Sequence, residues 1–150
     1  MRAQWLTVQS FQQGQELLAA INALSIHLKL QAEGVSDPRN AEAARDSREK
    51  LDGFLQELEP LVGERDGNQV SPALGTSPRI RQLADRFVRA RRDRGRFRSV
   101  LFREDITRAR RLLYSEAEED REPLLRCLEE LRYLIQEHVQ ADASQMMGQV

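Results

Sequence analysis

Apolar residues recur at spacings of three and four along most of this 150-residue chain. This period places apolar side chains on one face of an α-helix, whereas a half-buried strand alternates polar and apolar residues. Four segments repeat the pattern of the first run, which reads Phe11, Leu17, Ile21, Leu24 and Leu28. The sequence therefore predicts an all-α fold, a bundle of four or five helices that forms a single domain over residues 1–150.

Local signals bound the first two helices. Gly34 suits the position just after a helix end, where a left-handed backbone is common. Asp37 can cap the next helix, and Pro38 fits its first position, where a missing N–H costs nothing. We therefore expect helices over about 7–33 and 38–61. The short link between them predicts an antiparallel helical hairpin.

The third helix should begin at Ser77-Pro78, which repeats the combination of a capping residue and a proline. Its apolar stripe is followed by Arg91 and Arg94, which fall in the same arc of the helix. A helix packed on a core cannot bury two unpaired arginines. We therefore expect the third helix either to end near Ala90 or to project beyond the core there.

The rest of the chain predicts two more helices. A fourth helix is expected over about 99–114, and a long fifth helix follows the capping-box pattern that runs from Ser115 to Glu118. The glycine-containing segment 63–77 is predicted to be a mobile loop. Residues 141–150 lack the helical period and are predicted to form a frayed tail.

Positive charge is concentrated in residues 79–111, which we call the basic stretch. It contains 13 arginines and four acids, a local charge of +9 in a chain whose net charge is −1. Residues 112–150 carry a charge of −6. The hairpin is therefore followed by a basic helix pair and then by an acidic C-terminal helix. Outside the basic stretch, Arg48 interrupts the apolar stripe of the second helix.

Three interpretations of the basic stretch stay open. In the first interpretation, its arginines pair with acids of the second and fifth helices. Alternatively, they form a docking face for an acidic protein surface, or they bind nucleic-acid phosphates while Phe97 stacks on a base. The candidate partner- or phosphate-binding residues are Arg86, Arg89, Arg91, Arg92, Arg94, Arg96, Phe97, Arg98, Arg103, Arg108, Arg110 and Arg111. No complete nucleic-acid-binding motif accompanies them.

A second copy of the chain is a further candidate partner. At 1.5 Å per residue the first helix would span roughly 40 Å, which is longer than the third and fourth helices can cover. Incomplete burial of its apolar face favours a homodimer. The leading hypothesis is a non-catalytic helical adaptor or regulatory protein that binds a protein partner or itself. The alternative is a nucleic-acid-binding helical module that uses the basic stretch.

No combination of residues in the sequence indicates catalysis or metal binding. Cys127 is the single cysteine, which excludes an intramolecular disulfide and a cysteine-based zinc site. His27 and His138 lack the glutamate three residues earlier that helical di-metal sites use. Both lie beside apolar stripes, which predicts residues at the boundary of the core. No glycine-rich phosphate loop is present. We expect no enzymatic activity, cofactor, metal or small-molecule substrate.

The most apolar run of the chain, residues 17–30, is interrupted by polar residues and is too short to span a bilayer. It is also a poor match to a secretory signal peptide. Together with the single cysteine, these features favour a cytoplasmic protein that does not associate with membranes.

Overall fold

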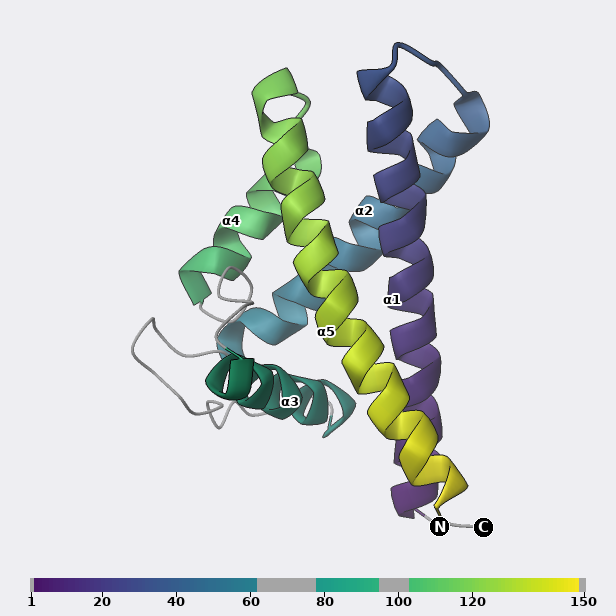
Figure 1. The fold of residues 1–150 in the computed structure, drawn as a ribbon, viewed down its shortest axis with the longest axis vertical. Coiled ribbons are helices and arrows are strands. Elements are labelled where there is room, and N and C mark those ends of the chain that lie inside the picture. The colour runs from purple at the N-terminus through teal and green to yellow at the C-terminus, as the bar shows by residue number, and fades with distance from the viewer. Residues whose placement is uncertain (1, 62–77, 95–102, 149–150) are drawn as a thin grey trace.

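The computed structural model describes the backbone of residues 2–61, 78–94 and 103–148, and the side chains of 5–61, 78–87 and 106–148. The described residues form helices and no strand, so the predicted all-α bundle is confirmed (Figure 1). The elements are α1 (Arg2–Ala32), α2 (Pro38–Leu58), the 3₁₀ turn η1 (Glu59–Leu61), α3 (Pro78–Arg94), α4 (Arg103–Tyr114), the 3₁₀ turn η2 (Glu118–Asp120) and α5 (Arg121–Met147).

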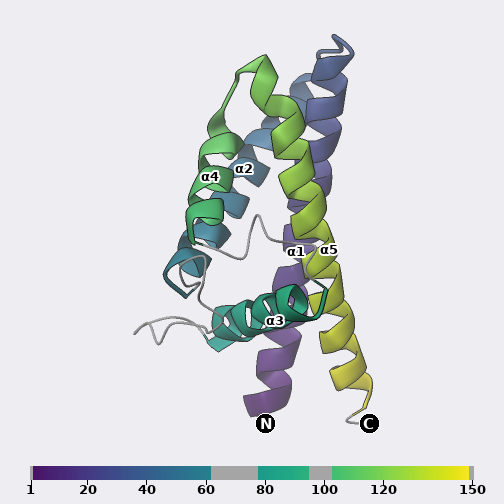
Figure 2. The ribbon, with the colours of Figure 1, turned by 60° about the vertical axis from the view of Figure 1, so that its left-hand side comes forward.

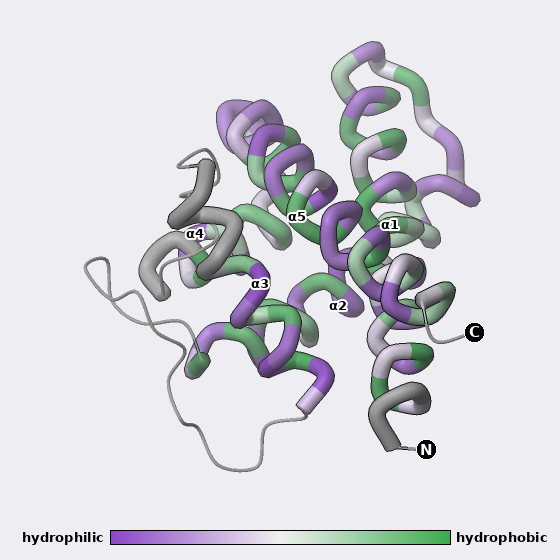
Figure 3. The backbone as a smooth tube through the Cα atoms, turned by 60° about the horizontal axis from the view of Figure 1, so that its bottom comes forward, coloured by the Kyte–Doolittle hydropathy of each residue, from purple (hydrophilic) through white to green (hydrophobic). Residues whose placement is uncertain are grey.

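The two longest helices, α1 and α5, form the spine of the fold. They lie side by side and run in opposite directions (Figures 1 and 2). The helix α2 turns back from the end of α1 and packs along it at an incline, and α4 packs against α2 and α5. The helix α3 lies across the other half of the spine and contacts both α1 and α5. Figure 3 shows hydrophobic and hydrophilic residues alternating along each helix, as amphipathic helices require.

The predicted signals between α1 and α2 are confirmed. Gly34 has a φ of +73°, the left-handed conformation expected after a helix end. The Gly34 N–H bonds the Gln31 carbonyl at 3.0 Å, and the Val35 N–H bonds the Leu30 carbonyl at 2.9 Å. These are the two bonds of a Schellman motif. Asp37 caps α2 by accepting a bond of 3.0 Å from the Arg39 N–H.

The helix α1 begins at Arg2, earlier than the predicted start near residue 7. Polar residues are buried in its early turns, which an apolar period does not register. Thr7 and Ser10 are 3% and 0% exposed. Gly14 allows the closest approach of α1 to α5, since a Cβ atom placed there would lie 2.5 Å from Cγ2 of Val139.

The basic helix α3 differs from one of the two predicted outcomes. It begins at Pro78 as predicted but continues to Arg94, so the expected end near Ala90 is wrong. The side chains of Arg91 and Arg94 lie outside the described residues, as does the predicted loop 63–77. The helix therefore extends through the segment where the arginines enter its apolar arc.

The start of α5 differs from a capping box. The Ser115 hydroxyl accepts a bond of 3.2 Å from the Ala117 N–H and donates one of 2.6 Å to Asp120. The side chain therefore closes the connection between α4 and η2 and leaves the N–H of Glu118 unbonded by this cap. At its other end α5 continues to Met147, whereas the missing period predicted a frayed tail from residue 141. Asp142, which is 0% exposed, anchors these last turns.

The core lies where α1, α2 and α5 meet and extends beneath α3 and α4. Leucine supplies most of the core. Between α2 and α3 the rings of Phe54 and Phe87 pack edge to face, with their centroids 6.5 Å apart. Within the described ranges, none of the helices combines the length and the apolarity that crossing a bilayer requires.

Candidate functional site

Two arginines of the basic stretch form ion pairs inside the fold. Nη1 of Arg86 lies 2.8 Å from Oδ1 of Asp142 on α5. Nε of Arg110 lies 2.7 Å from Oδ1 of Asp52 on α2, and its Nη1 lies 2.9 Å from Oε2 of Glu59. For Arg86 and Arg110 the internal interpretation of the basic stretch therefore holds.

The Arg110 pair belongs to a small polar network between α4 and the end of α2. Its hydrogen bond with Asp52 raises the pKa of Arg110 above the ordinary value. Thr107 donates to Glu59 at 2.7 Å, and the Tyr114 hydroxyl donates to Asp52 at 3.3 Å. The network is partly exposed, so it orients α4 on α2 more than it stabilises the fold.

The other candidate residues of the basic stretch fall into two groups. Arg108 and Arg111 are exposed on α4, and no acid among the described residues lies within ion-pair distance of either. The remaining candidates lack described side chains, and these are Arg89, Arg91, Arg92, Arg94, Arg96, Phe97, Arg98 and Arg103. The outward basic surface that the structure describes is therefore the exposed face of α4.

A buried polar cluster joins α1, α3 and α5. His138 is 1% exposed, so the prediction of a boundary residue is wrong for it, whereas His27 is half-buried as predicted. Nδ1 of His138 lies 2.7 Å from Nη1 of Arg86, and its Nε2 lies 2.7 Å from the Ser10 hydroxyl. Burial lowers the pKa of His138 from 6.5 to about 4, against the opposing charge of Asp142.

The cluster contains serine, histidine and aspartate but is not arranged as a hydrolase triad. A guanidinium only donates, so Nδ1 of His138 must accept from Arg86, and the neutral ring carries its proton on Nε2. Ser10 and Asp142 both approach that same nitrogen, at 2.7 and 3.3 Å. A triad needs the acid and the nucleophile on opposite nitrogens. The geometry instead ties three helices together.

One end of the α1–α5 pair carries exposed apolar side chains. Trp5 is 62% exposed and Met147 is 75% exposed. Residues 5 and 147 lie near the ends of α1 and α5 that point in the same direction (Figures 1 and 2). Residues 3–15 and 143–150 contain no charged residue, in a chain that is 31% charged. We call this region the apolar end.

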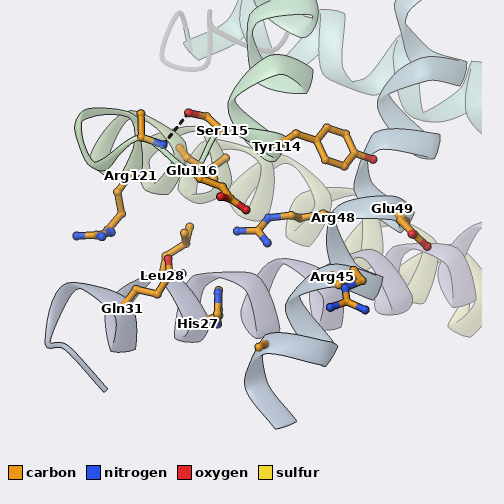
Figure 4. Close-up of a pocket in the computed structure, with 13 residues that line it drawn as sticks. His27, Leu28, Gln31, Arg45, Arg48, Glu49, Tyr114, Ser115, Glu116 and Arg121 are labelled. Atoms are coloured by element: carbon orange, nitrogen blue, oxygen red, sulfur yellow. Dashed lines mark hydrogen bonds between the residues drawn. The ribbon is translucent and has the colours of Figure 1, made fainter. Parts of the chain in front are cut away.

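A cleft of about 550 Å³ lies at the opposite end of α1 (Figure 4). Its walls come from the last turns of α1, the first half of α2, the α4–α5 connection and the start of α5. Three arginines line it, Arg45 and Arg48 from α2 and Arg121 from α5. None of the three belongs to the basic stretch.

Sequence reasoning missed both the polar cluster and the cleft because each is assembled from distant helices. His138 and Asp142 are four residues apart, which places them on one face of α5 and offered a signal. Arg48 offered another, since it interrupts an apolar stripe. Among the described residues, no three His, Cys, Asp or Glu side chains gather as they would around a metal ion.

No protein-family model, curated protein sequence or solved structure matches this chain.

Proposed function

We propose that this chain is a non-catalytic helical adaptor or regulatory protein that acts by binding a protein partner or a second copy of itself. The observation that carries the proposal is the apolar end. Large exposed apolar side chains that gather at one end of a molecule are a stronger indication of a binding surface than single ones scattered over it. Trp5 and Met147 are two of the most exposed large apolar side chains of the described chain.

A second copy of the chain is the partner that the apolar end fits best. At 1.5 Å per residue the 31 residues of α1 span about 46 Å, and the end of the α1–α5 pair extends past α3 (Figure 2). Two such ends can pack as four helices with their apolar side chains inside. The absence of charge in residues 3–15 and 143–150 removes the repulsion that would otherwise oppose pairing of identical surfaces.

Trp5 reports directly on this proposal because it is the only tryptophan in the chain. Self-association should shift its fluorescence to shorter wavelength as protein concentration rises, in step with dimer formation in sedimentation velocity. Met147→Ser should weaken the dimer. Ile26→Ser is the matched control, since Ile26 is 51% exposed in the half of α1 away from the apolar end. A monomer with unshifted emission at high concentration would contradict self-association.

Nucleic-acid binding is the second candidate, and the exposed face of α4 favours it. Arg108 and Arg111 present two cations that meet no acid among the described residues. Arginines that neutralise phosphates release counterions, so such binding weakens steeply with salt.

The test is titration of labelled single- and double-stranded nucleic acid across a salt series. The variant Arg108→Ala/Arg111→Ala should reduce the salt slope, whereas Arg39→Ala, which removes an exposed charge from α2, should not. No binding at about 50 mM salt would exclude the nucleic-acid candidate, because electrostatic binding is strong there. An acidic protein partner would show salt dependence without nucleic-acid binding.

A further inference from the structure

Two of the three cleft arginines, Arg48 and Arg121, are half-buried, and Arg45 is exposed. Arg86, Arg110 and Arg132 each lie within 4 Å of an acid. No ion pair of that length involves Arg45, Arg48 or Arg121 within the described part of the chain. The cleft therefore collects arginines that no acid of the described residues holds in an ion pair.

Arg48 is the most constrained of the three. Its Nε atom is shielded from solvent and has no hydrogen-bond partner. Nε of Arg132 is also unbonded, but another nitrogen of that side chain bonds Glu129 at 3.1 Å. A buried donor without an acceptor is unfavourable. The same side chain lines the cleft, so its other guanidinium nitrogens are available to an acceptor that enters.

The charge of Arg48 reaches across the cleft to α1. Burial, together with the nearby charge of Arg48, lowers the pKa of His27 below its ordinary value. Arg121 and Leu124 belong to the first turn of α5, where the partial positive charge of the helix N-terminus is offset by Glu122 and by the acids of η2. Arg48 therefore makes the α1 wall of the cleft positive, whereas burial and the charges of Asp52 and Glu49 raise the pKa of Tyr114 at another wall.

Two glutamates also line the cleft, and both are exposed. Figure 4 shows Glu49 directed away from the centre, whereas Glu116 points toward Arg48. Glu116 does not reach ion-pair distance of Arg48. It lies in the α4–α5 connection, which the bonds of Ser115 hold in place. Glu116 thus opposes an incoming anion without neutralising the arginine.

We propose that this cleft binds a small organic phosphate, whose phosphate group is held by Arg48 and Arg121 and whose organic part contacts Leu28, Leu124 and the ring of Tyr114. Arginine donates two parallel hydrogen bonds to phosphate oxygens. A volume of about 550 Å³ lies within the range of small-molecule sites, so there is room for more than an inorganic ion. The exposed aromatic ring of Tyr114 suits a planar group such as a nucleobase.

Calorimetric titration of the full chain with adenosine monophosphate, adenosine and inorganic phosphate tests the proposal. Adenosine monophosphate should bind, inorganic phosphate should bind more weakly, and adenosine should not bind detectably. Arg48→Met and Arg121→Met should each weaken binding about tenfold or more, the loss expected for one charge-assisted bond. Circular dichroism should show both variants folded.

Glu116→Gln should change the affinity in the opposite direction, because removal of the opposing carboxylate should tighten binding of adenosine monophosphate. Arg126→Met is the matched control, since it removes an exposed arginine of α5 that does not line the cleft. The His27 ring signals should shift in NMR spectra when the ligand binds.

Three results would overturn the proposal: no binding of either phosphate probe at millimolar concentration, equal loss in Arg126→Met and Arg48→Met, or weaker binding in Glu116→Gln. The cleft lies at the opposite end of α1 from Trp5, so this outcome is independent of self-association.

Discussion

Replacing Arg86 by methionine should destabilise the fold by about 3–5 kcal/mol at neutral pH, the usual cost of removing one partner of a buried ion pair. Asp142 is 0% exposed, and Arg86 is the cation that the structure places 2.8 Å from its carboxylate. His138 lies 3.3 Å from the same carboxyl group but is neutral near pH 7, because its pKa is about 4. The substitution therefore removes the cation that faces this buried carboxylate, and with it one of the charges that keep the pKa of His138 low.

An independent route leads to a similar magnitude. The variant can avoid the buried charge by protonating the carboxyl group as it folds. An ordinary aspartic acid titrates near pH 3.9, so its protonation at pH 7 costs about 4 kcal/mol. At pH 5 the same step costs only about 1.5 kcal/mol. The loss of stability in Arg86→Met should therefore shrink by more than half between pH 7 and pH 5.

Urea denaturation followed by far-ultraviolet circular dichroism measures this loss. Arg111→Met is the control, and it should change the free energy of unfolding by no more than about 0.5 kcal/mol because Arg111 is exposed. Adding Asp142→Asn to Arg86→Met removes the orphaned charge and should restore part of the stability. The reasoning fails if Arg86→Met costs no more than Arg111→Met, or if Asp142→Asn makes it worse.

Three further predictions concern other parts of the fold. His138 is neutral in the folded protein but takes up a proton on unfolding below pH 6.5. The free energy of unfolding should therefore fall by about 1 kcal/mol per pH unit as the pH is lowered from 6 to 5. His138→Gln should reduce this slope in urea denaturation series at the two pH values. Gly14→Ala should lower the thermal midpoint, because its Cβ would meet Val139 at 2.5 Å. In a Val139→Ala background the same change should instead stabilise by up to about 1 kcal/mol, the helix preference of alanine over glycine; an unchanged sign would contradict the packing argument. Asp37→Ala should cost about 1 kcal/mol in urea denaturation through loss of its 3.0 Å cap.

Features set by neighbouring residues could be predicted from the sequence. The left-handed Gly34, the cap at Asp37 and the proline that begins α3 all depend on interactions within a few residues. The helical period likewise depends on residues three and four positions apart in the sequence. Each was predicted because backbone geometry over one or two turns determines it, whatever the rest of the chain does.

Features that depend on which helix faces meet could not be predicted in this way. His138 occupies an apolar stripe, and the stripe alone does not indicate that Ser10 and Arg86 approach it from α1 and α3. The last turns of α5 carry no helical period, yet buried Asp142 anchors them. Polar residues that are satisfied by a distant partner are indistinguishable, in a one-dimensional pattern, from polar residues in solvent.

The arginines show how charge density along a sequence differs from charge in space. The basic stretch is conspicuous because its arginines lie close together in the sequence, but neighbouring residues on a helix point in different directions. Arg86 and Arg110 point inward from the stretch and are neutralised by Asp142 and Asp52. Arg48 lies outside the stretch, and its shielded Nε atom has no hydrogen-bond partner although the residue lines the cleft. An arginine that interrupts an apolar stripe is therefore a stronger indication of an anion site than a run of arginines, because burial makes its unpaired donors costly unless a ligand accepts them.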